Sequence, residues 1–72
     1  MYHYAAESDK GLSMTYDSPC WLVLAFDSKA KRDAYVKAHN DKAEAVDYNT
    51  ACKVAPELRS EAPGKAWRTV LM

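Results

Sequence analysis

Two cysteines and two histidines are the residues of this chain that could support nucleophilic catalysis or bind zinc. A nucleophilic thiol needs a neighbouring base and a third group that orients the base, and a structural zinc site needs a full set of thiolate or imidazole ligands. Cys20, Cys52, His3 and His39 form no CxxC pair and no recognisable catalytic signature. We therefore predict free, packed thiols and solvent-facing histidines, with no enzymatic activity, catalytic residue, metal or cofactor.

Phosphate binding and paired-carboxylate chemistry lack the residues that they require. Gly11 and Gly64 are the only glycines, so the sequence contains neither a P-loop nor a dinucleotide-binding fingerprint. The acidic residues are scattered, and Asp17, Asp27 and Asp41 stand where turns or helix caps are expected. These positions indicate a structural use for the acidic side chains.

The composition predicts one compact domain spanning residues 1–72. Apolar residues make up 49% of the chain, which is enough for a packed core and unlike a disordered segment. No apolar run approaches the roughly 18 residues of a membrane span, and the first residues lack the features of a signal peptide. We therefore expect a cytoplasmic protein with no membrane partner. The formal net charge of zero argues against strong non-specific binding of nucleic acid.

The segment Trp21–Phe26 is apolar at every position, which predicts the central strand of a sheet that is covered on both faces. Asp27 or Ser28 can cap the helix that follows. Within this helix, Tyr35 and the alanines among residues 30–38 fall on one arc, and we expect that arc to lie against the sheet.

Shorter elements are expected on either side. Strands are predicted at residues 2–6 and 12–16 as a β-hairpin, at 44–48, and at 66–71. A second helix, capped by Asn49 or Thr50, should end near Ala55, because Pro56 cannot continue it. The sequence thus predicts an α+β fold with the chain order β-β-β-α-β-α-β. It would be a single small mixed or antiparallel sheet with one longer and one short helix on one face.

Charged and aromatic side chains remain as candidates for partner binding. The basic cluster of the first helix is either a solvated face with ion pairs between successive turns or a contact patch for a charged partner. The tyrosines exceed what a small core can hide, and exposed tyrosine either packs at the core edge or anchors a protein interface. The predicted partner-binding residues are Tyr16, Lys29, Arg32, Lys37 and Tyr48.

One resemblance to known proteins rests on residues 20–58. A strand ends at Phe26-Asp-Ser-Lys29, the next helix carries Arg32-Asp-Ala-Tyr-Val36, and a Glu44-Ala-Val-Asp47 strand precedes another short helix. In size, cap placement and charged helix, this segment resembles small bacteriophage-encoded orphan proteins of the host-inhibitor kind, anti-CRISPR proteins among them. The resemblance implies a non-enzymatic protein that occupies a partner's surface, and it transfers no binding residue.

We therefore predict a protein-binding module, phage-encoded and active in the host cytoplasm, that inhibits a host defence or regulatory complex by stoichiometric binding. The alternative is a small nucleic-acid-binding regulator that uses Lys29, Lys31, Arg32 and Lys37. A third hypothesis is a structural piece of a larger assembly. The chain is expected to be a monomer, or a weak homodimer that pairs through an exposed sheet edge.

Overall fold

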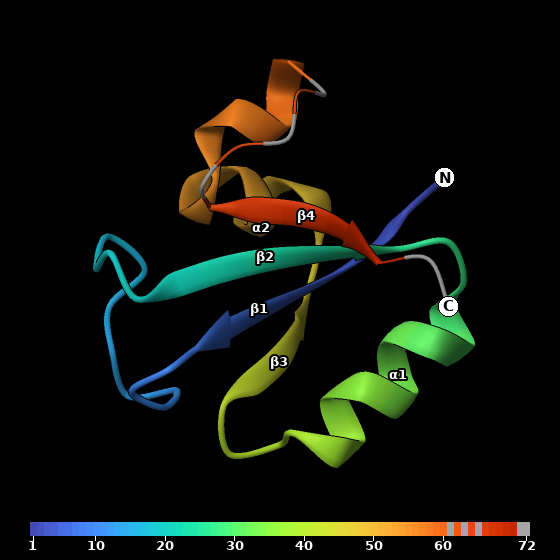
Figure 1. Cartoon of the computed structure of the whole chain (residues 1–72), viewed down its shortest axis with the longest axis horizontal. Helices are drawn as coiled ribbons and strands as arrows, with labels where there is room; N and C mark the ends of the chain where they lie inside the picture. The colour runs from blue at the N-terminus through green and yellow to red at the C-terminus, as the bar shows by residue number, and fades with distance from the viewer. Residues whose placement is uncertain (61, 63, 65, 71–72) are drawn as a thin grey trace.

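A four-stranded mixed sheet lies at the centre of the computed structural model, which describes residues 1–60, 62, 64 and 66–70 (Figure 1). The elements follow in the order β1 (His3–Ser8), β2 (Trp21–Phe26), α1 (Lys29–Ala38), β3 (Ala43–Val46), α2 (Tyr48–Val54), the 3-10 helix η1 (Pro56–Ser60) and β4 (Trp67–Val70). The α+β class and the single mixed sheet predicted from the sequence are confirmed.

The strand order across the sheet is β3-β1-β2-β4. Strand β1 is antiparallel to both of its neighbours, and β2 and β4 are parallel. The interior position of β2 was expected from its apolar sequence, and Val23, Leu24, Ala25 and Phe26 are fully buried. A strand with a neighbour on each side and helices above and below must be apolar at nearly every position.

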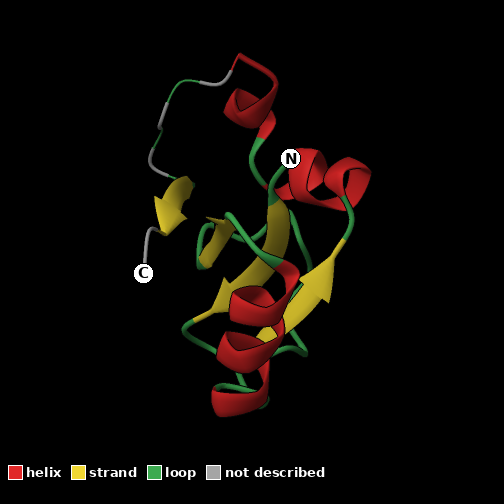
Figure 2. Ribbon diagram, turned by 90° about the vertical axis from the view of Figure 1, so that its right-hand side faces the viewer, coloured by secondary structure: helices red, strands yellow, loops and turns green. Residues whose placement is uncertain are grey.

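The two helices lie on opposite faces of the sheet, not on one face as the sequence suggested. Leu24 and Phe26 pack with Tyr35 and Val36 of α1, whereas Val23 and its alternate neighbours along β2 pack with α2 and η1. The connection from β2 to β3 crosses β1 in one direction, and the connection from β3 to β4 crosses back. The two crossovers can share a handedness only if they use opposite faces. Both views show α1 well apart from α2 (Figures 1 and 2).

The predicted strand at residues 12–16 is absent, and this segment forms turns. Strand β1 already pairs with β2 on one side and β3 on the other, so a hairpin partner has no free edge to join. Gly11 begins the segment with a φ of 92°, a conformation that favours glycine. The Trp21 indole donates to the Thr15 carbonyl at 2.7 Å and fixes the segment against the core. The described chain order is therefore β-β-α-β-α-β.

The helix boundaries agree in part with the predicted caps. Ser28 caps α1 and accepts from the Lys31 amide at 3.1 Å. Asp47, rather than Asn49 or Thr50, caps α2 and accepts from the Thr50 amide at 2.8 Å, so this helix begins at Tyr48.

The ends of α2 and of the chain follow the expected pattern. Helix α2 ends at Val54 with Ala55 as its C-cap, as Pro56 predicted. Strand β4 covers Trp67–Val70, and Leu71 of the predicted last strand lies outside the described residues.

The inward face of α1 differs from the predicted one. Tyr35 packs against the sheet as predicted, but the alanines among residues 30–38 are exposed, and Val36 packs against the sheet in their place. Larger apolar side chains remove more surface from water than alanine does, so the helix turns them inward. This orientation also places Arg32 at the boundary between α1 and the sheet, where it is half-buried.

Candidate functional site

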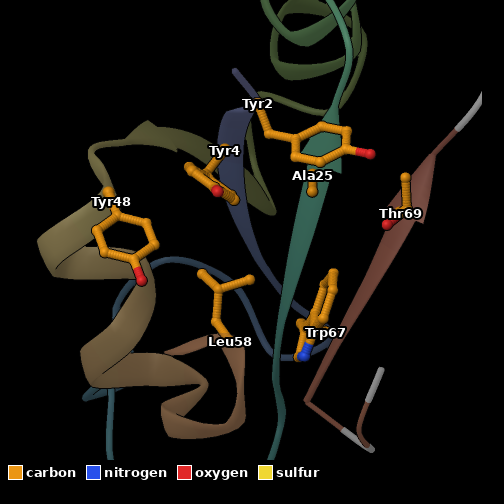
Figure 3. Close-up of a pocket in the computed structure, with 7 residues that line it drawn as sticks. All are labelled: Tyr2, Tyr4, Ala25, Tyr48, Leu58, Trp67 and Thr69. Carbon is orange, nitrogen blue, oxygen red and sulfur yellow. The ribbon is translucent and has the colours of Figure 1, made fainter. Parts of the chain in front are cut away.

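A cavity of about 290 Å³ opens on the α2 face of the sheet (Figure 3). Aromatic side chains and smaller neighbours from five different elements and the N-terminal segment form its wall, and we call it the tyrosine pocket. Its lining residues are Tyr2, Tyr4, Ala25, Tyr48, Leu58, Trp67 and Thr69.

The sheet supplies one wall of the pocket through a cross-strand row. Tyr4 of β1 stands opposite Ala25 of β2, and Ala25 stands opposite Thr69 of β4, so these three side chains share a face. Ala25 is the smallest member of the row and lies between two larger ones. Because alanine has no side chain beyond Cβ, the row leaves space above its centre.

The 3-10 helix η1 and strand β4 supply the floor. Pro56 stops α2, and η1 then brings Leu58 beneath the pocket, where it is 5% exposed. Trp67 is 6% exposed, and its indole N–H donates to the Ala62 carbonyl at 2.8 Å, which fixes the ring. The floor is thus apolar, buried and held in place.

The rim of the pocket is exposed tyrosine. Tyr2 is 46% exposed and Tyr48 is 45% exposed. The Tyr48 ring lies against the Tyr4 ring with centroids 5.8 Å apart and planes at 50°, a tilted aromatic pair. A hydrogen bond with the Cys52 thiol raises the pKa of Tyr48 above its ordinary value.

The chemistry available in the pocket is binding, not catalysis. None of the lining residues carries a charge, a thiol or an imidazole. The aromatic faces suit an apolar or aromatic group, and the tyrosine hydroxyls can donate hydrogen bonds at the rim. Within the described residues, no group of three or more His, Cys, Asp or Glu side chains could hold a metal ion.

The cysteines and histidines are not among the lining residues of the pocket, and they have structural partners. Cys20 and Cys52 are free thiols, and Cys52 is buried. The Cys20 sulfur lies 3.3 Å from the buried Ser8 hydroxyl. His39 stacks on Tyr35 with ring centroids 4.2 Å apart, and its Nδ1 lies 3.0 Å from the Tyr35 carbonyl. No cysteine–histidine pair is formed by these contacts.

The chain was compared with protein-family models, with curated proteins and with solved structures, and none of the three comparisons finds a match. In the part of the chain that the structure describes, no helix is both long enough and apolar enough to cross a membrane.

Of the two tyrosines predicted to bind a partner, Tyr48 lies in the pocket and Tyr16 does not. Tyr16 is half-buried, packs edge-on against Trp21 with centroids 4.9 Å apart, and donates a hydrogen bond to Glu44. This hydrogen bond and burial raise the pKa of Tyr16 to about 12. Tyr16 and Trp21 line a second, more open cavity of about 440 Å³.

The predicted cations of α1 are largely paired with acids. The Lys29 ammonium lies 2.7 Å from an Asp33 oxygen, and the Lys31 ammonium lies 3.0 Å from Asp27. The pKa of Asp33 is lowered by its hydrogen bonds from Lys29 and Arg32. Lys37 is exposed and forms no ion pair with a described residue.

Arg32 is not a surface cation. Its side chain is 14% exposed, and its Nε lies 2.7 Å from Asp33. Its Nη1 donates to the Tyr4 carbonyl of β1 at 3.1 Å. Arg32 therefore joins α1 to the strand that carries one wall of the pocket.

Leu58 and Trp67 are the pocket residues for which the sequence gave no signal. They come from η1 and β4, and in the sequence each looks like an ordinary core residue. Tyr2 and Tyr4 were candidates for exposure but were not assigned to a site. Only the packing of the final third of the chain against β1 and β2 brings these four side chains together.

Proposed function

We propose that this chain is a non-enzymatic protein-binding module that acts by stoichiometric association through the tyrosine pocket. The observation that carries the proposal is the pairing of two nearly half-exposed rings, Tyr2 and Tyr48, with a buried apolar floor. The absence of charge, thiol and imidazole from the lining fits binding better than catalysis.

Exposed aromatic rings beside a cavity are typical of interface anchors. Tyrosine contributes a large contact area with little rotamer entropy to lose, and binding energy concentrates where such rings surround a desolvated pocket. Tyr48 is positioned by the Asp47 cap and by its contact with Tyr4. Its side chain is therefore partly ordered before binding and loses less conformational entropy when a partner binds.

The alternative proposal, binding of nucleic acid by α1, has less support. Such binding requires cations that are free to neutralise phosphates. Lys29, Lys31 and Arg32 are each engaged by an acid on their own helix or its cap region, which leaves Lys37. A face with one unpaired cation offers few phosphate contacts.

The narrower proposal is an inhibitor of a host defence or regulatory complex in the host cytoplasm. It is supported by the resemblance of residues 20–58 to phage-encoded inhibitors. The pocket does not add to that support, because four of its lining residues lie outside this segment.

The test is a capture experiment with a C-terminally tagged bait, which leaves the rim at Tyr2 unobstructed. The variant carries Tyr2→Ala and Tyr48→Ala together, and the matched control carries Met14→Ala, an exposed apolar residue outside the pocket. We expect a defined partner to be retained by the wild type and the control and lost from the double variant. Calorimetry with the purified partner should then give a one-to-one stoichiometry. If the double variant retains the partner with unchanged affinity, the pocket is not the interface.

A further inference from the structure

We propose that the tyrosine pocket receives one apolar or aromatic side chain of the partner and that Arg59 pairs with a carboxylate beside that side chain. The ligand class is therefore a peptide segment with an apolar anchor next to an acidic group. This inference rests on the proposed function, because it names the chemistry that the same pocket recognises.

The size of the pocket limits its occupant. At about 290 Å³, the cavity is at the lower limit of small-molecule sites, which begin near about 300 Å³. An extended cofactor would exceed it, whereas a single side chain would fit. The anchor would contact Leu58 and Trp67 at the floor, and Figure 3 shows these two residues below Tyr4 and Ala25, on either side of the strand that carries Ala25.

Arg59 supplies a positive charge that reaches the rim residue Tyr48. This residue is exposed and directly follows Leu58 in η1. Figure 3 shows the Tyr48 hydroxyl turned toward the part of the chain that carries Leu58. Arg59 also acts electrostatically on the Tyr48 hydroxyl, and its positive charge opposes the effects that raise the pKa of Tyr48. Arg59 forms no ion pair with any described residue, so its guanidinium is available to a ligand.

This arrangement selects an acidic ligand over a basic one. Aromatic rings attract cations through their negative faces, but a bound ammonium would here lie close to the positive charge of Arg59. A carboxylate instead matches the planar donor fork of arginine and can accept two parallel hydrogen bonds. An uncharged anchor would use the pocket but leave Arg59 without a partner.

The experiment uses three probes that share a phenyl group and differ in charge: 3-phenylpropionate, 3-phenylpropionamide and 3-phenylpropylammonium. Binding is followed by the nuclear magnetic resonance shift of the Trp67 indole N–H, and the Trp21 indole reports on the second cavity. We expect the carboxylate to bind more tightly than the amide by up to about fivefold, the range of an exposed ion pair. The ammonium should bind most weakly.

Substitutions assign the preference to Arg59. Arg59→Gln should remove the difference between carboxylate and amide, and Arg59→Lys should retain part of it. Lys53→Gln, which removes an equal charge from the neighbouring helix, should leave it unchanged. The preference should also shrink when sodium chloride rises from about 10 mM to about 150 mM, because the Debye length falls from about 30 Å to about 8 Å.

Three outcomes would overturn the inference: a carboxylate that binds no better than the amide, an ammonium that binds best, or a preference that survives in Arg59→Gln. Failure to shift the Trp67 resonance with any probe would also overturn it. These outcomes are separate from the capture experiment. If the Tyr2 and Tyr48 double variant loses its partner while the probes show no charge preference, only the ligand chemistry is wrong. If that variant keeps its partner, the proposed function is wrong whatever the probes show.

Discussion

Replacing Arg32 by Gln should destabilise the fold, although the sequence places Arg32 and Lys37 on the same exposed helix. The structure separates them, because the Arg32 side chain is 14% exposed and its Nη1 donates to the Tyr4 carbonyl at 3.1 Å. A hydrogen bond that involves a charged group contributes about 1.5–3 kcal/mol. The pair with Asp33 adds little, because Asp33 is largely exposed and keeps its contact with Lys29.

We therefore expect Arg32→Gln to lower the free energy of unfolding by about 1.5–3 kcal/mol. A domain of this size has a few kcal/mol of net stability, so the loss is a large fraction of the total. Each kcal/mol also corresponds to about 4–8 °C in the melting temperature.

The assay is urea unfolding followed by tryptophan fluorescence, with Lys37→Gln as the matched control. The control should change the unfolding free energy by less than about 0.5 kcal/mol, as is usual for exposed positions. If the two variants unfold at the same urea concentration, the contact between Arg32 and Tyr4 does not stabilise the fold and the assignment of Arg32 to the sheet boundary is wrong.

Three further predictions concern the core, two half-buried tyrosine hydroxyls and the thiols. Leu24→Ala should cost about 2–5 kcal/mol in urea unfolding, because Leu24 is fully buried on the α1 face; a variant that unfolds like the wild type would contradict this. Tyr16 and Tyr35 have their pKa raised to about 12, Tyr16 chiefly by its hydrogen bond to Glu44 and Tyr35 chiefly by burial. The two hydroxyls should therefore contribute fully to the free energy of unfolding below pH 10, and this contribution should decrease as pH rises through about 12. Replacing both tyrosines by phenylalanine should abolish that decrease. In thiol titration, half-buried Cys20 should react before buried Cys52, and both should react after unfolding without a reductant; finding neither thiol reactive, with a mass lower by two hydrogens, would show a disulfide.

The sequence alone determined the elements whose signals are local. Strand β2 was predictable because every position of Trp21–Phe26 is apolar, and only an interior strand with both faces covered accommodates such a run. Ser28 was among the predicted caps, and the end of α2 before Pro56 follows from the missing N–H of proline. The α+β class followed from these elements in order.

Tertiary structure decided the features that depend on contacts between distant segments, such as which strand edges are already paired and which helix face packs on the sheet. Residues 12–16 alternate as a strand should, but both edges of β1 are occupied, so the segment forms turns. Tyr35 and the alanines of α1 fit a sheet-facing arc, but only Tyr35 of that arc packs against the sheet, together with Val36, because these larger side chains bury more apolar surface than alanine. The faces that the helices cover depend on the direction of each crossover along the sheet, which no local pattern encodes.

The candidate site belongs almost entirely to the features that tertiary structure decided. Tyr48 was predicted because an exposed tyrosine is informative wherever it occurs, whereas Leu58 and Trp67 look like ordinary core residues in the sequence. The pocket exists because β4 pairs in parallel with β2 and places Thr69 beside Ala25, on the side away from Tyr4, while η1 brings Leu58 beneath this row. Hydrophobic periodicity specifies which residues are buried. The space left between residues that are distant in the sequence is set by strand register and helix placement, because these fix the separation of side chains that share no local contact.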